Sequence, residues 1–371
     1  MTMPRISRNR GLTLIEVMIG MVIGLIGIII ITQVYLVNEN YKRSTTGAGG
    51  AQVNGAIALY TLERDLRMAG YGIAHSDALS CGQLRYYYNG NYSTPPGGTL
   101  PNVVVAPVVI TDGGVGPDTI TVMYATGEVR NVPATLSKNM ADAAAALNVD
   151  NPTGFSQNPG DLIFVSQGGV CTLMQVTQEG VPLHHVASGT ALWNPSSPAA
   201  SFTTYTQGAL VFNLGRPVVN TYSINSNSLQ LLGMFTATSS TVVQSYNATP
   251  LSLISDIVDL RAQYGKDNGV NNGTVTNTTY TANDGIVDSY DTVTPATAAA
   301  WQQVLSVRIG VLARSQNYEK PDPPGGACTA TTSAPTWQGG TFAVPDGIPS
   351  CYKYRAFDTV VPLRNMLWRQ S

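Results

Sequence analysis

Residues 11–37 read GLTLIEVMIGMVIGLIGIIIITQVYLV, and this stretch decides the fold. The run from Leu12 to Val37 is apolar and carries a single charged side chain, Glu16. A carboxylate at the centre of a bilayer costs about 2.5 kcal/mol or more, so its presence in a segment of membrane-spanning length indicates a specific use. The residues before Gly11 contain no acid and three arginines, Arg5, Arg8 and Arg10.

The order of these features is the reverse of a secretory signal peptide. There the small-residue cleavage site follows the apolar core, whereas here Gly11 precedes it. An ordinary membrane anchor would have the same apolar run and basic flank, but it would need neither Glu16 nor the glycine. A cleavable secretory signal is disfavoured because the apolar run is about twice the usual length.

The segment Gly11-Leu12-Thr13-Leu14-Ile15-Glu16-Val17 resembles the type IV prepilin signature. The resemblance implies that prepilin peptidase cleaves between Gly11 and Leu12 and that the new amino group of Leu12 is N-methylated, although the family usually has phenylalanine there. It also implies that Glu16 pairs with the N-terminal amine of a neighbouring subunit during assembly. The chemistry is consistent, because a carboxylate in a low dielectric needs a charged partner.

The absence of proline between Pro4 and Pro95 allows one helix from Leu12 to near Ala69. Its apolar part would be about 39 Å long, more than the ~30 Å of bilayer hydrocarbon. The stretch Gly47-Ala48-Gly49-Gly50 predicts a kink or a locally melted turn, because each glycine costs up to about 1 kcal/mol in a helix.

The second half of this helix is amphipathic. An apolar face recurs at helical spacing and is predicted to lie on a sheet; it comprises Leu59, Leu62, Leu66 and Ala69. The opposite, solvent-facing side is predicted to comprise Glu63, Arg64, Asp65 and Arg67. Gly70 and Gly72 are expected to end the helix.

The chain after Cys81 has the pattern of strands separated by turns. The candidate strands are Val103–Ile110, Thr119–Tyr124, Leu162–Val165, Thr172–Val176, Leu210–Leu214, Val218–Ile224, Leu229–Leu232, Val258–Tyr264, Leu305–Arg314 and Tyr352–Val361. Two of them alternate cleanly and predict core faces made of Val258, Leu260, Ala262 and Tyr264, and of Leu305, Val307, Ile309, Val311 and Ala313. Ala141–Leu147 is either a short helix or a loop.

These features predict an α+β protein with a long N-terminal helical spine packed on a β-rich, mainly antiparallel head domain. We divide the chain into a leader at 1–11, a membrane or filament-core helix at 12–37, its amphipathic continuation at 38–70, and the head at 71–371.

The resemblance narrows further within the head. Four segments resemble PilW-type minor pilins, the first of them most distinctively: Leu62–Gly72, Asp118–Val122, Val304–Ser315 and Tyr354–Asn365. The stretch from Pro133 to Pro250 offers no recognisable motif.

Four cysteines, Cys81, Cys171, Cys328 and Cys351, allow three pairings. Disulfides are the default in an exported chain. Cys328 and Cys351 flank a segment rich in Pro, Gly and Thr, and closing that loop would contribute about 3 kcal/mol. We therefore predict Cys328–Cys351, which leaves Cys81–Cys171; the alternative is four buried free thiols.

The sequence contains one candidate metal-binding segment and none of the common catalytic motifs. The Gly265–Asp291 segment is rich in oxygen ligands of the kind that hold calcium, with Asp284 and Asp288 as the first candidates, but its spacing misses the EF-hand pattern. An ordinary loop of Asx turns is the favoured interpretation, so no metal and no cofactor are predicted. The sequence lacks G-x-S-x-G, H-E-x-x-H and Walker motifs. His75, His184 and His185 are expected in loops or at the surface.

Charge argues against a nucleic-acid partner. The chain has 20 basic and 22 acidic residues; three basic residues lie in the leader, which leaves 17 against 22, a net charge of −5. No basic run interleaves with aromatic residues.

The resemblance implies a non-enzymatic minor pilin that helps to initiate type IV pilus assembly near the tip. The implied partners are prepilin peptidase, other minor pilins, the major pilin, the inner-membrane assembly platform and a large tip adhesin. The precursor would cross the inner membrane of a Gram-negative bacterium once, with its leader cytoplasmic and its head periplasmic, before joining a fibre at the cell surface. Alternatives are a J-type minor pseudopilin of type II secretion, or an adhesion or DNA-uptake subunit that binds through the loops at Gly265–Asp291 and Pro321–Pro349.

Overall fold

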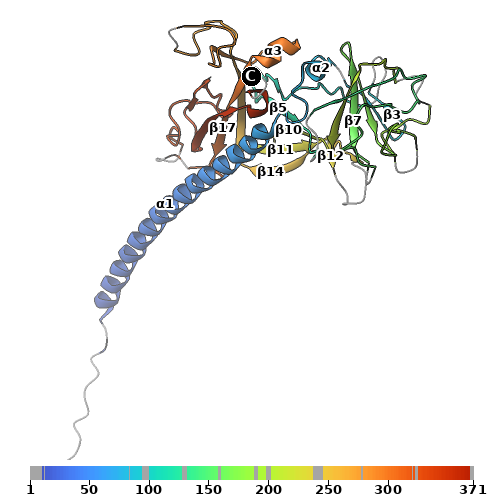
Figure 1. The fold of residues 1–371 in the computed structure, drawn as a ribbon. Helices are drawn as coiled ribbons and strands as arrows, with labels where there is room; N and C mark the ends of the chain where they lie inside the picture. The colour runs from blue at the N-terminus through green and yellow to red at the C-terminus, as the bar shows by residue number, and fades with distance from the viewer. Residues whose placement is uncertain are drawn as a thin grey trace, which may run out of the picture.

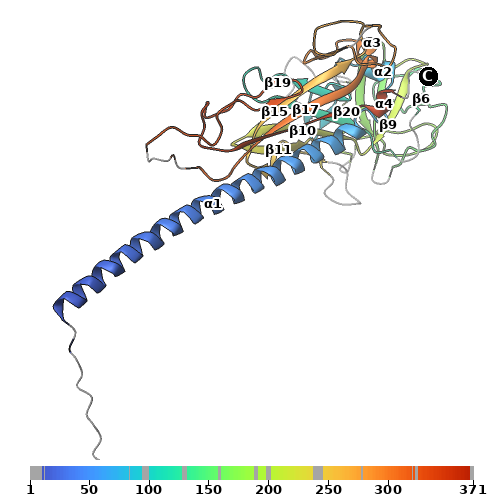
Figure 2. The ribbon, with the colours of Figure 1, turned by 90° about the vertical axis from the view of Figure 1, so that its left-hand side faces the viewer.

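The computed structural model describes residues 11, 13–82, 84–93, 100–127, 132–157, 160–187, 191–197, 202–236, 245–276, 279–319, 321 and 325–367. One 55-residue helix, α1 (Leu14–Met68), leads into a head made of strands (Figure 1). The first half of α1 projects away from the head, and the second half lies against it (Figures 1 and 2). The predicted α+β architecture, with a long apolar N-terminal helix before a mostly antiparallel domain, is confirmed.

The head contains two lobes. The lobe next to α1, here called the proximal lobe, holds two sheets. One has the order β14 (Leu251–Ser255), β11 (Ser228–Gly233), β10 (Val218–Asn225), β5 (Thr119–Tyr124) and β4 (Val108–Thr111). The other has the order β16 (Ser289–Asp291), β15 (Ile257–Lys266), β17 (Val304–Arg314) and β20 (Tyr354–Pro362).

The second lobe, here called the distal lobe, extends past the end of α1 (Figure 1). Its sheet has the order β1 (Leu84–Arg85), β8 (Val170–Gln175), β7 (Leu162–Gln167), β9 (Leu210–Gly215) and β6 (Ala134–Thr135), with β1 parallel to β8 and the other pairs antiparallel.

Shorter elements complete the head. Three two-stranded ribbons are β2 (Tyr87–Tyr88) with β3 (Asn91–Tyr92), β12 (Phe235–Thr236) with β13 (Ser245–Tyr246), and β18 (Thr336–Trp337) with β19 (Gly340–Thr341). The short helices are α2 (Ser76–Leu79), α3 (Ala298–Gln302) and α4 (Arg364–Leu367). Ala141–Leu147 is a loop that ends in a single bridge between Leu147 and Leu183.

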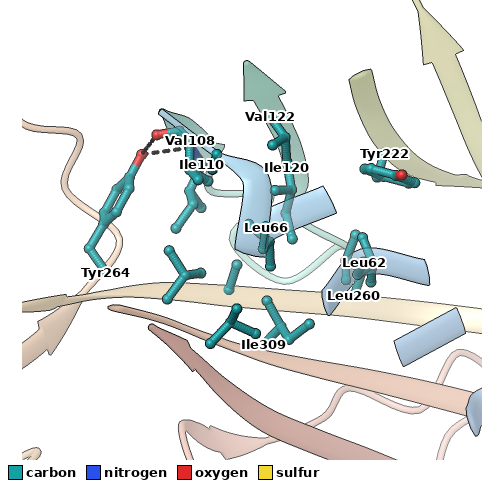
Figure 3. Packing of buried hydrophobic residues seen from close by; sticks show 14 of the residues in the cluster. Leu62, Leu66, Val108, Ile110, Ile120, Val122, Tyr222, Leu260, Tyr264 and Ile309 are labelled. Atoms are coloured by element: carbon teal, nitrogen blue, oxygen red, sulfur yellow. Dashed lines mark hydrogen bonds between the residues drawn. The ribbon is translucent and has the colours of Figure 1, made fainter. Parts of the chain in front are cut away.

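The main core lies where α1 meets both proximal sheets (Figure 3). Leu62 and Leu66 of α1 are fully buried there against strand residues that include Ile120, Leu260 and Ile309. Full burial of one such side chain is worth about 1.5–3 kcal/mol. The helix is therefore held to the head by its predicted apolar stripe.

A buried tyrosine links the two proximal sheets. Tyr264 on β15 accepts a hydrogen bond from the Ile110 amide (2.7 Å) and donates one to the Val108 carbonyl (3.1 Å), both on β4 (Figure 3). Its ring also packs edge-on against Trp301 of α3. Because β4 and β15 belong to different sheets, this hydroxyl fixes how the sheets meet.

The predicted kink at Gly47–Gly50 is wrong, because α1 continues through these residues without a break. An added Cβ at Gly47 would lie 3.3 Å from Ser315 Cβ, so this glycine permits close approach to the segment after β17. Lys353 also bonds to Ser44, one turn earlier. These contacts with the head offset the low helix propensity of glycine.

The alternation predicted for β15 and β17 holds in the middle and fails at the ends. A bulge between Ile257 and Asp259 turns Ile257 into the main core and leaves Val258 on the opposite face, with Leu312 and Phe342. A second shift beside Lys266 places Val304, rather than Leu305, in the main core. Each bulge inserts one residue and so reverses the alternation beyond it.

The strand predicted at Val103–Ile110 is only partly correct, since β4 begins at Val108. Residues 101–106 form no strand, although Val103 and Val105 are buried in the distal core. Pro107 interrupts the run, because proline cannot donate to a ladder and constrains the residue before it.

Two glycines of α1 provide a matched test of its docking. At Gly55 an added Cβ would overlap the ring of Phe357 on β20, whereas at Gly50 no atom lies within 4 Å. We expect Gly55→Ala to destabilise the chain by about 1–3 kcal/mol through overpacking. Gly50→Ala should stabilise it by up to about 1 kcal/mol through helix propensity. Thermal unfolding of the full chain in detergent measures both, and equal effects of the two variants would contradict the docking.

The buried hydroxyl of Tyr264 predicts that the fold loses stability at alkaline pH. Burial raises the pKa of Tyr264 to about 12 from its ordinary 10.0. Between pH 10 and 12 the unfolded chain therefore loses a proton that the folded chain keeps, so stability falls as pH rises. Tyr264→Phe removes this titrating group. Between pH 10 and 12 the free energy of unfolding of the variant should therefore fall less steeply with pH, by about 1.4 kcal/mol per pH unit.

At neutral pH, Tyr264→Phe should cost about 1–3 kcal/mol, because two buried backbone groups lose their partner. Denaturant unfolding across pH 7–12 tests both effects. Tyr60→Phe is the control, because Tyr60 is 67% exposed. If the free energy of unfolding of Tyr264→Phe fell as steeply above pH 10 as that of the unaltered chain, the raised pKa of Tyr264 would be refuted.

Candidate functional site

The N-terminal half of α1, from Leu14 to Val37, does not pack on the head and is apolar on every side. Its large side chains from Leu14 to Val37 are exposed without contact to the head, with Leu14 at 80% and Ile31 at 70%. Soluble monomers rarely expose apolar patches above a few hundred Å². A helix that is hydrophobic all round belongs in a membrane or in the core of an assembly. Among the described residues, α1 is the helix long and apolar enough to span a bilayer.

Glu16 lies at the N-terminal tip of this surface. The Thr13 amide and hydroxyl both donate to Glu16 Oε2, each at 3.3 Å. The carboxylate thus covers the first turn of its own helix, where the helix dipole favours negative charge. Both bonds are long and exposed, so the carboxylate can exchange them for a stronger cationic partner.

The predicted processing site lies at the limit of the described chain. Gly11 is exposed and outside any helix or strand. Leu12 and residues 1–10 of the predicted leader lie outside the described residues, so the structure gives no geometry for the Gly11–Leu12 bond.

A polar boundary follows the apolar half. Arg43 and Glu39 form an i,i+4 ion pair at 3.1 Å, just beyond Val37. Within the apolar half, the Thr32 hydroxyl donates to the Ile28 carbonyl at 2.8 Å and so is satisfied inside the helix. Beyond Glu16, the next charged side chains of α1 therefore lie after the apolar half.

Asp65 joins the helix to the head and was misassigned from sequence. It is 2% exposed, not solvent-facing as predicted. Its Oδ2 accepts hydrogen bonds from the Tyr222 hydroxyl and from Asn220 Nδ2 on β10, both at 2.6 Å. Burial, followed by this carboxylate, raises the pKa of Tyr222, so the phenol remains a donor. Asp65 lies three residues after Leu62 and four before Ala69, so it shares their face of the helix. This spacing is the sequence signal that could have revealed the burial of Asp65.

The end of α1 is also tied to the head. Asn365 donates to the carbonyls of Met68 (3.1 Å) and Ala69 (3.0 Å) at the end of the helix, and the Met68 carbonyl also accepts from the Tyr71 amide (3.1 Å). Gly70 adopts a φ of +80°, and its amide donates to the Met123 carbonyl at 2.9 Å. The helix therefore stops at a defined position on the head.

The structure contains the disulfides Cys81–Cys171 and Cys328–Cys351, with Cα–Cα distances of 5.8 and 4.7 Å. The first anchors the segment after α2 to β8 of the distal lobe. The second closes the loop between β17 and β20. Each disulfide joins two segments that are separated in sequence by long stretches without regular secondary structure.

The histidines are placed differently from one another. His185 lies in a loop, as expected, but its side chain is buried and its Nε2 lies 3.0 Å from the Ala145 carbonyl. Burial lowers its pKa, so it is neutral at physiological pH. His184 forms a bridge with Gln178, and His75 accepts a hydrogen bond from the Asp77 amide.

The calcium candidates are separated by burial. Asp284 is exposed and accepts from the Ile286 amide at 2.9 Å, as in an Asx turn. Asp288 is fully buried. Among the described residues no group of three or more His, Cys, Asp or Glu is placed to hold a metal.

Two family models match the chain. Residues 221–365 match a family described as type IV pilus-assembly protein W; the match begins within β10, spans β11 to β20 and ends within α4. Residues 6–32 match the prokaryotic N-terminal methylation motif, which covers residues 6–11 of the predicted leader and most of the apolar half of α1. No curated protein and no solved structure gave a significant match. The sheet of the distal lobe lies outside both matched segments.

The Asp65 cluster yields a prediction with an internal control. Asp65→Ala should cost about 2–4 kcal/mol, because it strands the buried donors of Tyr222 and Asn220. Glu63→Ala removes the same charge two residues away, but it breaks only an exposed pair with Arg67 worth about 0–1 kcal/mol. Urea unfolding of both variants measures the difference, and equal losses would contradict a structural role for Asp65.

Proposed function

We propose that this chain, a type IV pilin-like protein of the PilW type, is a minor pilin that helps to initiate pilus assembly near the filament tip. The family matches support a pilin related to type IV pilus assembly and a membrane-anchored N-terminal helix. The observation that carries the proposal is the division of α1. One half is buried on the head, and the other half is apolar on all faces and uncovered.

The mechanism is an exchange of one apolar environment for another. The Leu14–Val37 surface would lie in the inner membrane before assembly and against sister helices afterwards. Because it stays out of water in both states, the transfer loses little hydrophobic free energy. The head must follow rigidly for the helix to seat correctly, and the Asp65 and Asn365 contacts provide that rigidity.

Glu16 would direct the transfer. We propose that prepilin peptidase cleaves between Gly11 and Leu12, that the Leu12 amine is methylated, and that Glu16 pairs with the amine of a neighbouring subunit. An ion pair in a low dielectric avoids an uncompensated charge, which otherwise costs about 3–5 kcal/mol. The two 3.3 Å bonds to Thr13 are the ones that Glu16 would give up.

The shape of the head supports a position near the tip. The distal lobe extends beyond the end of α1, away from the apolar half (Figure 1). In a filament built on parallel helices, a subunit stacked above would meet this lobe, whereas a subunit at the tip has no neighbour there. The expected partners are other minor pilins, the major pilin, the assembly platform and a large tip adhesin.

The family match favours a pilus over a type II secretion pseudopilus, since its description names type IV pilus assembly. We propose a structural rather than an enzymatic role. The precursor would have a cytoplasmic leader and a periplasmic head, and the assembled protein would lie in a fibre on the cell surface.

The role of Glu16 is tested by substitution. Glu16→Ala should leave the precursor stable and cleaved after Gly11, because the hydrogen bonds of the carboxylate to the described residues are the two long ones from Thr13. Incorporation into pili should fall by about tenfold or more, since an unpaired ammonium is left in the filament core. Immunoblots of membrane and sheared-pilus fractions measure both quantities.

Glu39→Gln is the matched control, because it removes a carboxylate from the same helix outside the apolar run. It should assemble normally. Normal piliation and normal incorporation of Glu16→Ala would sink the proposed role.

A further inference from the structure

The loop between β15 and β16 is held by two buried aspartates that reach across it. Asp267, on the first limb, accepts a hydrogen bond through Oδ2 from the Gly285 amide at 2.7 Å. Asp288, on the second limb, accepts one through Oδ2 from the Gly269 amide at 2.6 Å. Both side chains are 0% exposed. The two limbs therefore clasp one another through reciprocal carboxylates.

Each carboxylate has one oxygen left over. Asp267 Oδ1 and Asp288 Oδ1 are buried and have no hydrogen-bond partner among the described residues. Neither aspartate belongs to an ion pair in that part of the chain; the nearby Lys266 pairs with Asp291 at 2.6 Å instead. Buried charges are ordinarily paired or coordinate metals. Two unpartnered acceptors in one clasp therefore indicate a missing positive charge.

We propose that Asp267 and Asp288 bind one calcium ion that cross-links the two limbs of this loop. Both unpartnered atoms are carboxylate oxygens, which suit calcium better than zinc, whose usual protein ligands include nitrogen and sulfur. Calcium accepts carboxylate, amide, main-chain carbonyl and water oxygens in a flexible shell of about 6–8 ligands. Magnesium requires a near-ideal octahedron and gives up its waters reluctantly, so a loop of this kind discriminates against it.

The assignment differs from the pair suggested by the sequence pattern. Asp288 is retained, and Asp267 takes the place of Asp284, whose exposed carboxylate already closes a local turn with Ile286. With only two carboxylates the site carries little charge, so a dissociation constant on the order of 0.1–1 mM is expected, as in extracellular calcium modules. Such a site would fill outside the cytoplasm and stiffen the loop next to β16.

The test is a calcium titration of the purified full chain in detergent after treatment with EDTA. Calorimetry with CaCl2 should show one ion bound per chain, and the melting temperature should rise in a saturable way. MgCl2 at the same concentration should give a clearly smaller rise. Asp267→Asn and Asp288→Asn keep an acceptor for the glycine amides and should each weaken calcium binding by about tenfold or more.

Asp284→Asn is the matched control, since it removes an exposed charge from the same loop and should bind calcium like the unaltered chain. The unaltered chain is informative by itself if a variant fails to fold. Absence of calcium binding up to about 10 mM, well above the weakest extracellular sites, would overturn the proposal. So would an equal response to magnesium, or calcium binding that is lost in Asp284→Asn but kept in Asp267→Asn and Asp288→Asn.

Discussion

The structure depends on one constraint: an apolar helical surface must remain out of water while the rest of the same helix is fixed to a folded head. The exposed side chains from Leu14 to Val37 have no partner in the described part of the head, and the proposed function supplies one first from the membrane and then from the assembly. The buried stripe of Ala58, Leu62 and Leu66 serves the opposite purpose. It makes head and helix one body, so that a force on either moves both.

Polar groups give this body a defined geometry. Asp65 sets the rotation of α1 on β10 through Tyr222 and Asn220, and Tyr264 sets the angle between the two proximal sheets through β4. Apolar packing alone tolerates small slides and rotations, whereas a buried acceptor with two short bonds does not. The same rule explains the importance of the clasp in the β15–β16 loop, where two acceptors remain without donors among the described residues.

Regular periodicity made much of the fold predictable from sequence. The 3.6-residue period and the absence of proline predicted α1, and period-2 alternation located most of the long strands. The failures occurred where a tertiary contact overrides the local pattern. The bulges at Ile257 and Lys266 change which residues of the two strands face the core, and no residue type at these positions predicts a bulge. Asp65 has a charged side chain at a buried position, and its two partners on β10 lie more than 150 residues away in sequence. Gly47 stays helical because the head packs against it.

The site could be predicted only in part, for the same reason. The motif around Gly11 and Glu16 is local and can be found in the sequence, whereas the clasp of Asp267 and Asp288 depends on how two loop limbs cross. The central claim is that a processed apolar helix leaves the membrane for a filament. Mass spectrometry of the N-terminus of the protein recovered from sheared pili tests it most directly. The account predicts a chain that begins at N-methylated Leu12; a chain that still carries the arginines of residues 1–11, or a chain absent from pili, would contradict it.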